Sequence, residues 1–198
     1  MNDLRKMSDE ELALEYIDGN NSAFDLLLSR NETKLFSYIL FMVRDRHIAE
    51  DVFQDTFVKI IVKLNEGKYR TTGKFSAWAM RIAHNVIMDR FREHKVENVV
   101  ETDEENDMSN ISISELLVSN AEDSFVRTQV LRDVEKIMNK LPDSQREVVY
   151  MRFYQNLSFR EIAEIKDMSI NTALGRMRYA VINMRKMARE YNVALQME

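Results

Sequence analysis

The chain has 198 residues, of which 45% are hydrophobic and 31% are charged, and its formal net charge is −5. The absence of cysteine excludes disulfides and thiolate metal sites and suits a reducing compartment, so we expect a cytoplasmic protein. Only 4 glycines and 1 proline are available for turns, which favours an all-α fold over a sheet of many short strands. Since no apolar run reaches about 18 residues, we expect no membrane insertion.

Charge is distributed unevenly along the sequence. From Lys68 to Lys95 seven basic residues accompany two acidic ones, whereas Val96 to Ser124 holds nine acidic residues and no basic one. From Lys166 to Glu190 six basic residues accompany two acidic ones. Two basic segments separated by an acidic one indicate a nucleic-acid partner despite the negative net charge. Uneven surface charge without such a partner is the simpler alternative.

Apolar residues at helical spacing predict five helices in the first half of the chain. Their expected ranges are 9–18, from about 22, 32–43, 48–64 and 75–92. Ser8 and Glu11 form a predicted capping box for the first of them. In the fourth helix the residues expected to point inward are Phe53, Thr56, Phe57, Ile60 and Leu64. A loop over 65–74 that contains two glycines precedes the fifth helix.

The second half is predicted to follow a flexible acidic linker, residues 96–121. A helix from about residue 122 must end before Leu141, because the residue before Pro142 disfavours the α conformation. Another helix is expected from about Asp143. Its predicted core residues are Val148, Val149 and either Met151 or Phe153.

Residues 157–187 are typical of a helix-turn-helix. Ser158 and Glu161 form a second capping box, for a short helix that ends near Ile165. Three residues then lead to Ser169, a natural N-cap for a long final helix. In such motifs the start of the second helix enters the major groove of DNA. Similar helix pairs also occur in proteins that do not bind DNA.

The final helix is predicted to have one apolar and one polar face. Its apolar face comprises Ile170, Ala173, Met177, Val181, Met184 and Ala188. On the polar face, asparagine and arginine side chains can pair with base edges, and Lys186 lies further along, where a phosphate contact is expected. Gly175 also falls on this face. A glycine there indicates either close approach of another backbone or a tolerated imperfection.

Three sequence patterns can be compared with known proteins. Helix 75–92 has the order Phe-x-x-Trp-x-x-Arg-Ile-Ala-x-Asn-x-x-x-Asp-x-x-Arg, and residues 49–57 have the order Ala-Glu-Asp-x-x-Gln-Asp-x-Phe. The third pattern comprises Leu141, Pro142, Arg146, Arg152, Ser169, Thr172, Arg176 and Ala180. Together they resemble bacterial sigma factors of the sigma-70 family, in particular the extracytoplasmic-function (ECF) group. The chain departs from the family pattern at Asn171, Leu174, Gly175 and Tyr179, which leaves the recognised promoter sequence open.

The resemblance implies three sets of site residues. The residues expected to dock on the β′ clamp helices of RNA polymerase are Glu50, Asp51, Gln54 and Asp55. Those expected to recognise the melted −10 promoter element are Lys68, Tyr69, Arg70, Lys74, Arg81, His84, Asn85 and Arg92. Those expected to recognise the −35 element are Ser169, Asn171, Thr172, Arg176, Arg178, Tyr179 and Lys186.

Physical chemistry is compatible with these roles and leaves simpler alternatives open. A compact acidic patch suits a basic partner, although a solvated helix face has the same composition. Tyr69, in a loop with glycines, could stack on a base or simply pack the loop. Trp78 lies in the middle of the apolar stripe and is expected in the core. No nucleophile, phosphate-binding loop or clustered histidine accompanies the carboxylates, so we expect no catalytic site, metal or cofactor.

The resemblance therefore implies a two-domain, all-α transcription initiation factor that is not an enzyme. Its expected domains are residues 1–95 for polymerase binding and −10 recognition, the linker 96–121, and residues 122–198 for −35 recognition. Expected partners are the β′ and β subunits of core RNA polymerase, promoter DNA and, by family analogy, an anti-sigma factor. Two alternatives are a free-standing helix-turn-helix regulator that binds duplex DNA as a dimer, and an adaptor that binds only proteins.

Overall fold

The computed structural model describes residues 3–70, 74–97, 134 and 136–190. These residues form helices and no strand, which confirms the all-α prediction. The chain divides into two compact units, residues 1–109 (unit 1) and 110–198 (unit 2). Most of the predicted linker 96–121 and of the helix expected from about 122 lies outside the described residues. No helix in the described ranges is long and apolar enough to cross a membrane.

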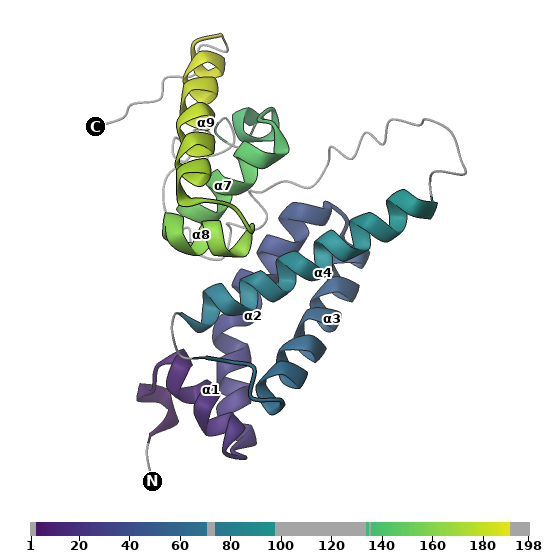
Figure 1. The fold of residues 1–198 in the computed structure, drawn as a ribbon, viewed down its shortest axis with the longest axis vertical. Coiled ribbons are helices and arrows are strands. Elements are labelled where there is room, and N and C mark those ends of the chain that lie inside the picture. The colour runs from purple at the N-terminus through teal and green to yellow at the C-terminus, as the bar shows by residue number, and fades with distance from the viewer. Residues whose placement is uncertain (1–2, 71–73, 98–133, 135, 191–198) are drawn as a thin grey trace, which may run out of the picture. The chain divides into compact units, whose positions relative to one another are not determined.

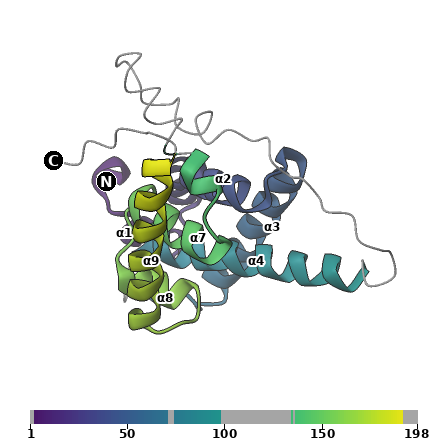
Figure 2. The same cartoon turned by 90° about the horizontal axis from the view of Figure 1, so that it is seen from above.

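Unit 1 is a bundle of helices built around α2 (Figures 1 and 2). Its elements are η1 (Leu4–Lys6), α1 (Asp9–Ile17), α2 (Asn21–Val43), α3 (Arg46–Asn65) and α4 (Phe75–Glu97). Helix α2 packs against α1, α3 and α4, and α3 also packs against α4. Side chains with no more than 2% exposure fill the space between them, among them Leu12, Tyr38, Ile39, Ile60 and Ile87.

Polar side chains fix where the helices of unit 1 begin. The predicted capping box is present, because the Ser8 hydroxyl accepts from the Glu11 amide at 3.2 Å and the Glu11 carboxylate accepts from the Ser8 amide at 2.7 Å. At the start of α3 the Asp45 carboxylate accepts from the Ile48 amide at 2.9 Å. Glu10 on α1 accepts the Phe75 amide at 2.8 Å, so α1 supplies a partner at the first residue of α4.

The prediction of separate helices from about 22 and over 32–43 is wrong, since α2 runs unbroken over Asn21–Val43. The polar segment between the two expected helices binds α1 and the residues that precede it. Arg30 donates to the Met7 carbonyl at 2.7 Å, and the Asn31 amide donates to the Asp9 carboxylate at 2.8 Å. With its polar groups satisfied and no proline or glycine present, this segment continues the helix.

The inward face of α3 differs from the prediction only in part. Thr56 is fully buried as predicted, together with Val52, and the Thr56 hydroxyl donates to the Val52 carbonyl at 2.7 Å. Phe53 and Phe57 are only half-buried. The Phe53 ring packs edge-on against Phe36 of α2, with 5.5 Å between ring centroids. The two phenylalanines therefore lie at the edge of the α2–α3 contact, whereas the smaller residues Val52 and Thr56 are buried at its centre.

Unit 2 has a core formed by three helices, α7 (Asp143–Phe153), α8 (Phe159–Ile165) and α9 (Ile170–Glu190). Residues 136–139 are helical and the helix ends before Leu141, as the following proline predicts. Of the two alternatives on α7, Met151 is buried whereas Phe153 is 66% exposed. Ile170, expected on the apolar face of α9, is the first residue of the helix and is 46% exposed.

Candidate functional site

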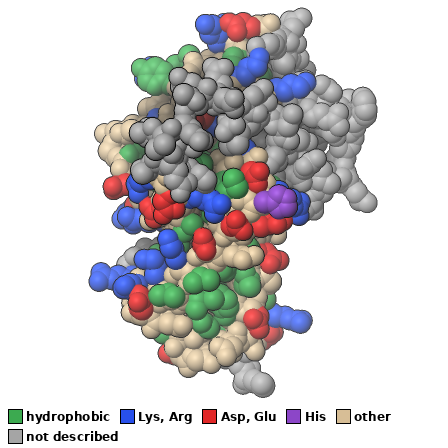
Figure 3. Space-filling model, turned by 90° about the vertical axis from the view of Figure 1, so that its right-hand side faces the viewer, with side chains coloured by type: hydrophobic (Ala, Val, Ile, Leu, Met, Phe, Trp, Pro, Cys, Tyr) green, Lys and Arg blue, Asp and Glu red, His purple; other side chains and the backbone are tan. Residues whose placement is uncertain are grey.

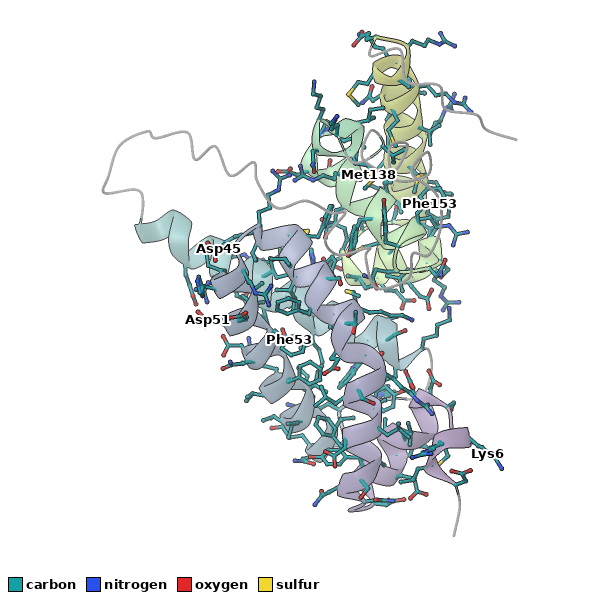
Figure 4. All side chains as sticks on the ribbon, turned by 180° about the vertical axis from the view of Figure 1, so that it is seen from behind. Lys6, Asp45, Asp51, Phe53, Met138 and Phe153 are labelled. Carbon is teal, nitrogen blue, oxygen red and sulfur yellow. The ribbon has the colours of Figure 1, made fainter. Side chains whose placement is uncertain are left out.

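The acidic face of α3 is a patch on unit 1 formed by the predicted residues Glu50, Asp51, Gln54 and Asp55. Asp51, Gln54 and Asp55 are exposed and Glu50 is half-buried. In Figure 4 Asp51 projects outward from α3, whereas Phe53 points toward α2. Arg46 donates to the Glu50 carboxylate at 3.1 Å within the same helix. The structure thus brings the four predicted residues together on one accessible surface.

The loop before α4 presents cations and buries its tyrosine. Lys68, Arg70 and Lys74 are exposed, and Lys68 pairs with Glu66 at 2.8 Å. The hydrogen bond and charge of Lys68 lower the pKa of Glu66. Tyr69, in contrast, is only 7% exposed, and burial raises its pKa to about 12, with Glu10 and Asp9 adding to the effect.

The prediction that Tyr69 is available for base stacking is therefore wrong for this structure. Its ring packs against Phe75 and Trp78, with centroid separations of 5.7 and 5.0 Å. Its hydroxyl has no hydrogen-bond partner among the described atoms. Edge-on aromatic packing at the start of α4 explains the burial. Tyr69 thus packs the loop, the simpler of the two interpretations.

His84 is a second correction to the predicted −10 surface. The side chain is only 7% exposed, and its Nδ1 lies 2.9 Å from the Tyr38 hydroxyl on α2. Its neighbours on α4, Arg81 and Asn85, are exposed. Position 84 follows the buried residues Met80, Ile82 and Ala83 and falls on the core side of the helix. A histidine here stabilises the α2–α4 contact and does not face solvent.

Helices α3 and α4 enclose an open groove of about 640 Å³. Val58, Val62, Trp78 and Ile82 supply apolar side chains, and the cations Lys59, Lys63 and Arg81 lie among them; Glu66, Asn85 and Asp89 complete the lining. Lys59 and Asp89 approach to 4.0 Å across it, and Asp89 also accepts from Arg92 at 2.8 Å. On the face drawn in Figure 3, hydrophobic side chains gather on unit 1 among charged ones.

The chemistry of this groove suits an unstacked nucleotide. Apolar and aromatic side chains offer surface to a base, cations attract the backbone, and an amide can hydrogen-bond a base edge. Arg81 and Asn85 were predicted as site residues from the sequence. The groove residues on α3 were not, among them Val58, which is 60% exposed, and Val62, which is 46% exposed. Both valines continue the helical stripe that begins at Asp51 and Asp55, and this spacing could have revealed them. Trp78, expected in the core, is half-buried and lines the groove.

In unit 2 the predicted helix-turn-helix is present with its caps. The Ser158–Glu161 capping box starts α8, with hydrogen bonds of 3.2 and 2.7 Å. At the turn Asp167 adopts a left-handed conformation with φ 48°, and the Met168 amide donates to the Ala163 carbonyl at 3.0 Å. This is the geometry of a Schellman-type helix end. The Ser169 hydroxyl then accepts from the Thr172 amide at 3.0 Å and caps α9.

A buried ion pair holds the turn against α7. The Lys166 ammonium donates to the Glu147 carboxylate, with the two side chains 12% and 5% exposed. Burial lowers the pKa of Lys166 to about 8, and Arg176 adds to the effect. On the other side, Asn183 of α9 donates to Gln145 of α7 at 2.9 Å. These contacts fix α9 on α7 and leave its opposite face open.

The outward face of α9 carries most of the predicted −35 residues. Side chains of this face that are exposed include Asn171, Thr172, Arg178, Tyr179 and Lys186, while Arg176 is half-buried. The hydroxyls of Ser169 and Thr172 lie 2.8 Å apart and serve the cap. Leu174, which was not predicted as a site residue, is 44% exposed at the edge of this face, nearest to Arg178 and Asn171. A Cβ added at Gly175 would meet no atom within 4 Å.

Comparisons with known proteins agree with the division of the chain into two units. Residues 27–96 match the family model of sigma-70 region 2, and residues 131–175 match sigma-70, region 4. The ECF RNA polymerase sigma factor SigW of Bacillus subtilis is 26% identical over 174 residues, which cover 87% of this chain and 92% of SigW. The RNA polymerase sigma-H factor of Pseudomonas aeruginosa is 26% identical over 177 residues, covering 87% and 90% of the two chains.

Solved structures give the same fold. The sigma factor RpoE from Bartonella quintana, in complex with the anti-sigma factor NepR, superposes with a TM-score of 0.64 at 21% identity and covers 84% of this chain and 96% of its own. CnrH, in complex with the cytosolic domain of CnrY, gives 0.62 at 23% identity and covers 92% and 97%. Both family regions occur here in order and together span more than half of the sequence. The chain therefore belongs to the sigma-70 family of RNA polymerase sigma factors, in its ECF group.

Proposed function

We propose that this chain binds core RNA polymerase, directs it to specific promoters and assists strand opening. The observation that carries the proposal is the presence of two surfaces of different chemistry in the sigma-70 region 2 unit and a helix-turn-helix in the region 4 unit. In this proposal residues 1–95 bind polymerase and the −10 element, 96–121 link the domains, and 122–198 bind the −35 element. The chain needs no catalytic group of its own, because the polymerase performs the chemistry.

The acidic face of α3 is the proposed docking site for the β′ clamp helices. Its three exposed residues, Asp51, Gln54 and Asp55, form a compact patch that can accept hydrogen bonds and ion pairs from a basic helix. Electrostatic attraction of this kind accelerates association and makes it sensitive to salt. The adjacent exposed Val58 extends the patch with apolar surface that a partner helix could cover. The β subunit is a further proposed partner.

The groove between α3 and α4 is the proposed contact for the melted −10 strand. Arg81 and Asn85 line it, and the exposed cations Lys68, Arg70, Lys74 and Arg92 lie on the preceding loop and further along α4. The buried side chains of Tyr69 and His84 are excluded from this proposed set. Cations next to an apolar groove bind the backbone and the unstacked bases of a single strand. Because a base in a duplex cannot reach the groove, this binding favours the opened strand.

The outward face of α9 is the proposed contact for the −35 element. The cap at Ser169 and the Lys166–Glu147 ion pair hold the start of α9 in a fixed position on α7 and α8. In a helix-turn-helix this end of the second helix enters the major groove. Asn171 and Arg178 are then available for base edges, and Lys186 for a phosphate.

An anti-sigma factor is a further proposed partner. RpoE of Bartonella quintana was solved in complex with such a protein, and CnrH with the cytosolic domain of CnrY. A protein that covers the acidic face or the α9 face would prevent polymerase or promoter binding. The alternative of a free-standing helix-turn-helix regulator is not favoured, because it would leave the sigma-70 region 2 match without a role.

The proposal is tested by reconstituting transcription from core polymerase, with and without the full chain, on a pool of genomic fragments from the source bacterium. Core binding is measured in parallel by fluorescence anisotropy of the labelled chain. We expect nanomolar to micromolar binding and discrete transcripts that require the chain. Absence of both would contradict the sigma-factor function, while sequence-specific duplex binding without core binding would support the free-standing regulator.

A further inference from the structure

We propose that Leu174 determines promoter specificity by packing against the 5-methyl group of a thymine in the major groove. The inference rests on the proposed −35 function of α9 and goes beyond it, since it assigns the chemistry by which one position is discriminated. The exposed side chains in the first three turns of α9 are Ile170, Asn171, Thr172, Leu174, Arg178 and Tyr179.

Leu174 lies at the place where a recognition helix meets base edges. It is the fifth residue of α9, whose N-terminal end is fixed by the Ser169 cap, and it is 44% exposed. The buried residues Ala173 and Met177 anchor the neighbouring face of the helix to the core of unit 2, since they lie roughly 60–100° around the helix from Leu174. Since the N-terminal half of the second helix enters the groove, the exposed part of the Leu174 side chain is available to the base edges.

The surroundings of Leu174 leave room for a close approach. Asn171 and Arg178 lie one turn before and one turn after it, and Gly175 next to it has no side chain. A Cβ at Gly175 would meet no atom of another helix within 4 Å, so this position is open to a partner. The helix Ile170–Glu190 contains five basic residues and one acidic residue, so the outward face is electrostatically suited to DNA.

The chemistry of leucine selects one base. A leucine side chain can neither donate nor accept a hydrogen bond, so it cannot distinguish guanine, adenine or cytosine by their polar edges. Thymine alone presents a methyl group in the major groove, and apolar side chains contact it. A polar base edge opposite Leu174 would instead lose its water without a replacement partner. We therefore expect a thymine at the base step covered by Leu174.

The test uses holoenzyme reconstituted from core polymerase and the full chain. Duplex fragments with a random segment are first selected for holoenzyme binding, and each thymine of the selected −35 region is then replaced by uracil, which lacks only the methyl group. For the unaltered chain, uracil in place of the thymine that contacts Leu174 should lower the affinity of the holoenzyme for the fragment about threefold to fivefold, which is the effect expected for burial of one methyl group. Replacement of the other thymines should change affinity less.

Variants assign the effect to Leu174. Leu174→Ala should abolish the difference between thymine and uracil at that position, whereas Leu174→Met, with similar volume, should retain it. Leu174→Lys should shift the selected base toward guanine, whose N7 and O6 accept hydrogen bonds. Ile182→Ala is the matched control, because Ile182 is exposed by 48% on the same face but two turns further along, and it should leave the discrimination intact.

The outcomes separate the two proposals. If the holoenzyme selects a sequence and initiates from it but uracil substitution has no effect at any position, or Leu174→Ala retains the discrimination, the Leu174 inference is wrong while the sigma function stands. The same holds if the selected −35 region contains no thymine. If the holoenzyme neither selects a sequence nor initiates, the sigma function fails and the inference fails with it. Circular dichroism and thermal unfolding verify that each variant is folded.

Discussion

Asp51 on α3 and Arg90 on α4 form an ion pair across the two helices, with 3.6 Å between the carboxylate and the guanidinium. The Asp51 side chain is 64% exposed and the Arg90 side chain 28% exposed. One oxygen of Asp51 therefore contacts the protein while most of the carboxylate remains accessible. Because the pair is largely solvated, it contributes only about 0–1 kcal/mol to the stability of unit 1. Asp51 can be altered without loss of the fold, which makes it a suitable probe of the acidic face.

We predict that Asp51→Asn combined with Gln54→Ala weakens core polymerase binding about tenfold, which corresponds to ~1.4 kcal/mol. The loss should diminish as salt is raised, because screening weakens the contribution of the carboxylate. Anisotropy titrations of labelled variant against core polymerase measure the change. Urea unfolding should show a stability within about 1 kcal/mol of the unaltered chain.

Asp3→Asn is the matched control for this double variant. Asp3 is also an exposed carboxylate in unit 1, and it pairs with Lys6 at 3.7 Å. Figure 4 labels Lys6 at the opposite end of unit 1 from Asp51. The control should bind core polymerase normally. Equal affinities for the control and the double variant would show that the acidic face is a solvated surface and not a docking site.

We predict that Arg81→Ala weakens binding of single-stranded non-template DNA to the holoenzyme and lowers its salt dependence. Loss of one phosphate contact to a single strand reduces the slope of log K against log salt by about 0.7. Titrations with a fluorescent oligonucleotide at several salt concentrations provide the slope. Lys6→Ala, a cation with 85% exposure away from the groove, should leave the slope unchanged. A normal slope for Arg81→Ala would contradict the proposed role of the groove.

We predict that Tyr69→Phe stabilises unit 1 or leaves its stability unchanged, because it removes a buried hydroxyl that has no partner among the described atoms. The variant should also change the pH dependence. Burial disfavours the ionised form and raises the pKa of Tyr69 from 10.0 to about 12 on folding, so ionisation costs no stability below pH 10 and unit 1 loses stability as pH rises from 10 toward 12.

Urea unfolding of the two proteins at pH 9 and at pH 11.5 measures this difference. The unaltered chain should lose more stability than Tyr69→Phe between the two pH values. Tyr179→Phe, at a tyrosine with 62% exposure, controls for removal of a hydroxyl as such. A large destabilisation by Tyr69→Phe at neutral pH would indicate that the hydroxyl has a partner after all.

We predict that Gly175→Ala stabilises unit 2 by about 1 kcal/mol, since alanine is the better helix former and the added methyl meets no atom within 4 Å. Thermal unfolding followed by circular dichroism measures the change. Lower stability would mean that the backbone at this position is not freely helical. Comparison of promoter affinity then separates the two interpretations of the glycine. Weaker binding by the more stable variant would indicate close approach of DNA.

Local hydrogen-bond patterns were the most predictable part of the fold. Both Ser–Glu capping boxes, at Ser8 and Ser158, depend on residues three positions apart, so the pattern is visible in the sequence and recurs in the structure. The interruption expected within α2 was wrong for the opposite reason. Arg30 and Asn31 find their partners on α1 and its approach, more than twenty residues away, and no local pattern reveals such contacts.

The candidate site was predictable in its outline but not in the orientation of individual side chains. The acidic face of α3 follows from helical spacing alone, and its residues lie together as expected. Tyr69 and His84 have polar groups that suit DNA, but tertiary packing determines their burial: Tyr69 packs against Trp78 and His84 against Tyr38 on another helix. The exposed Val58 and Leu174 were missed because apolar residues in helices are ordinarily assigned to the core.

Primer extension of transcripts made by core polymerase, with and without this chain, on one selected promoter fragment tests the sigma function most directly. We predict discrete 5′ ends at a fixed distance downstream of the −10 element that appear only when the chain is present. The Asp51→Asn, Gln54→Ala double variant should give the same ends in lower yield. Identical ends from core polymerase alone, or no ends with the chain present, would contradict the assignment of this protein as a promoter-specific initiation factor.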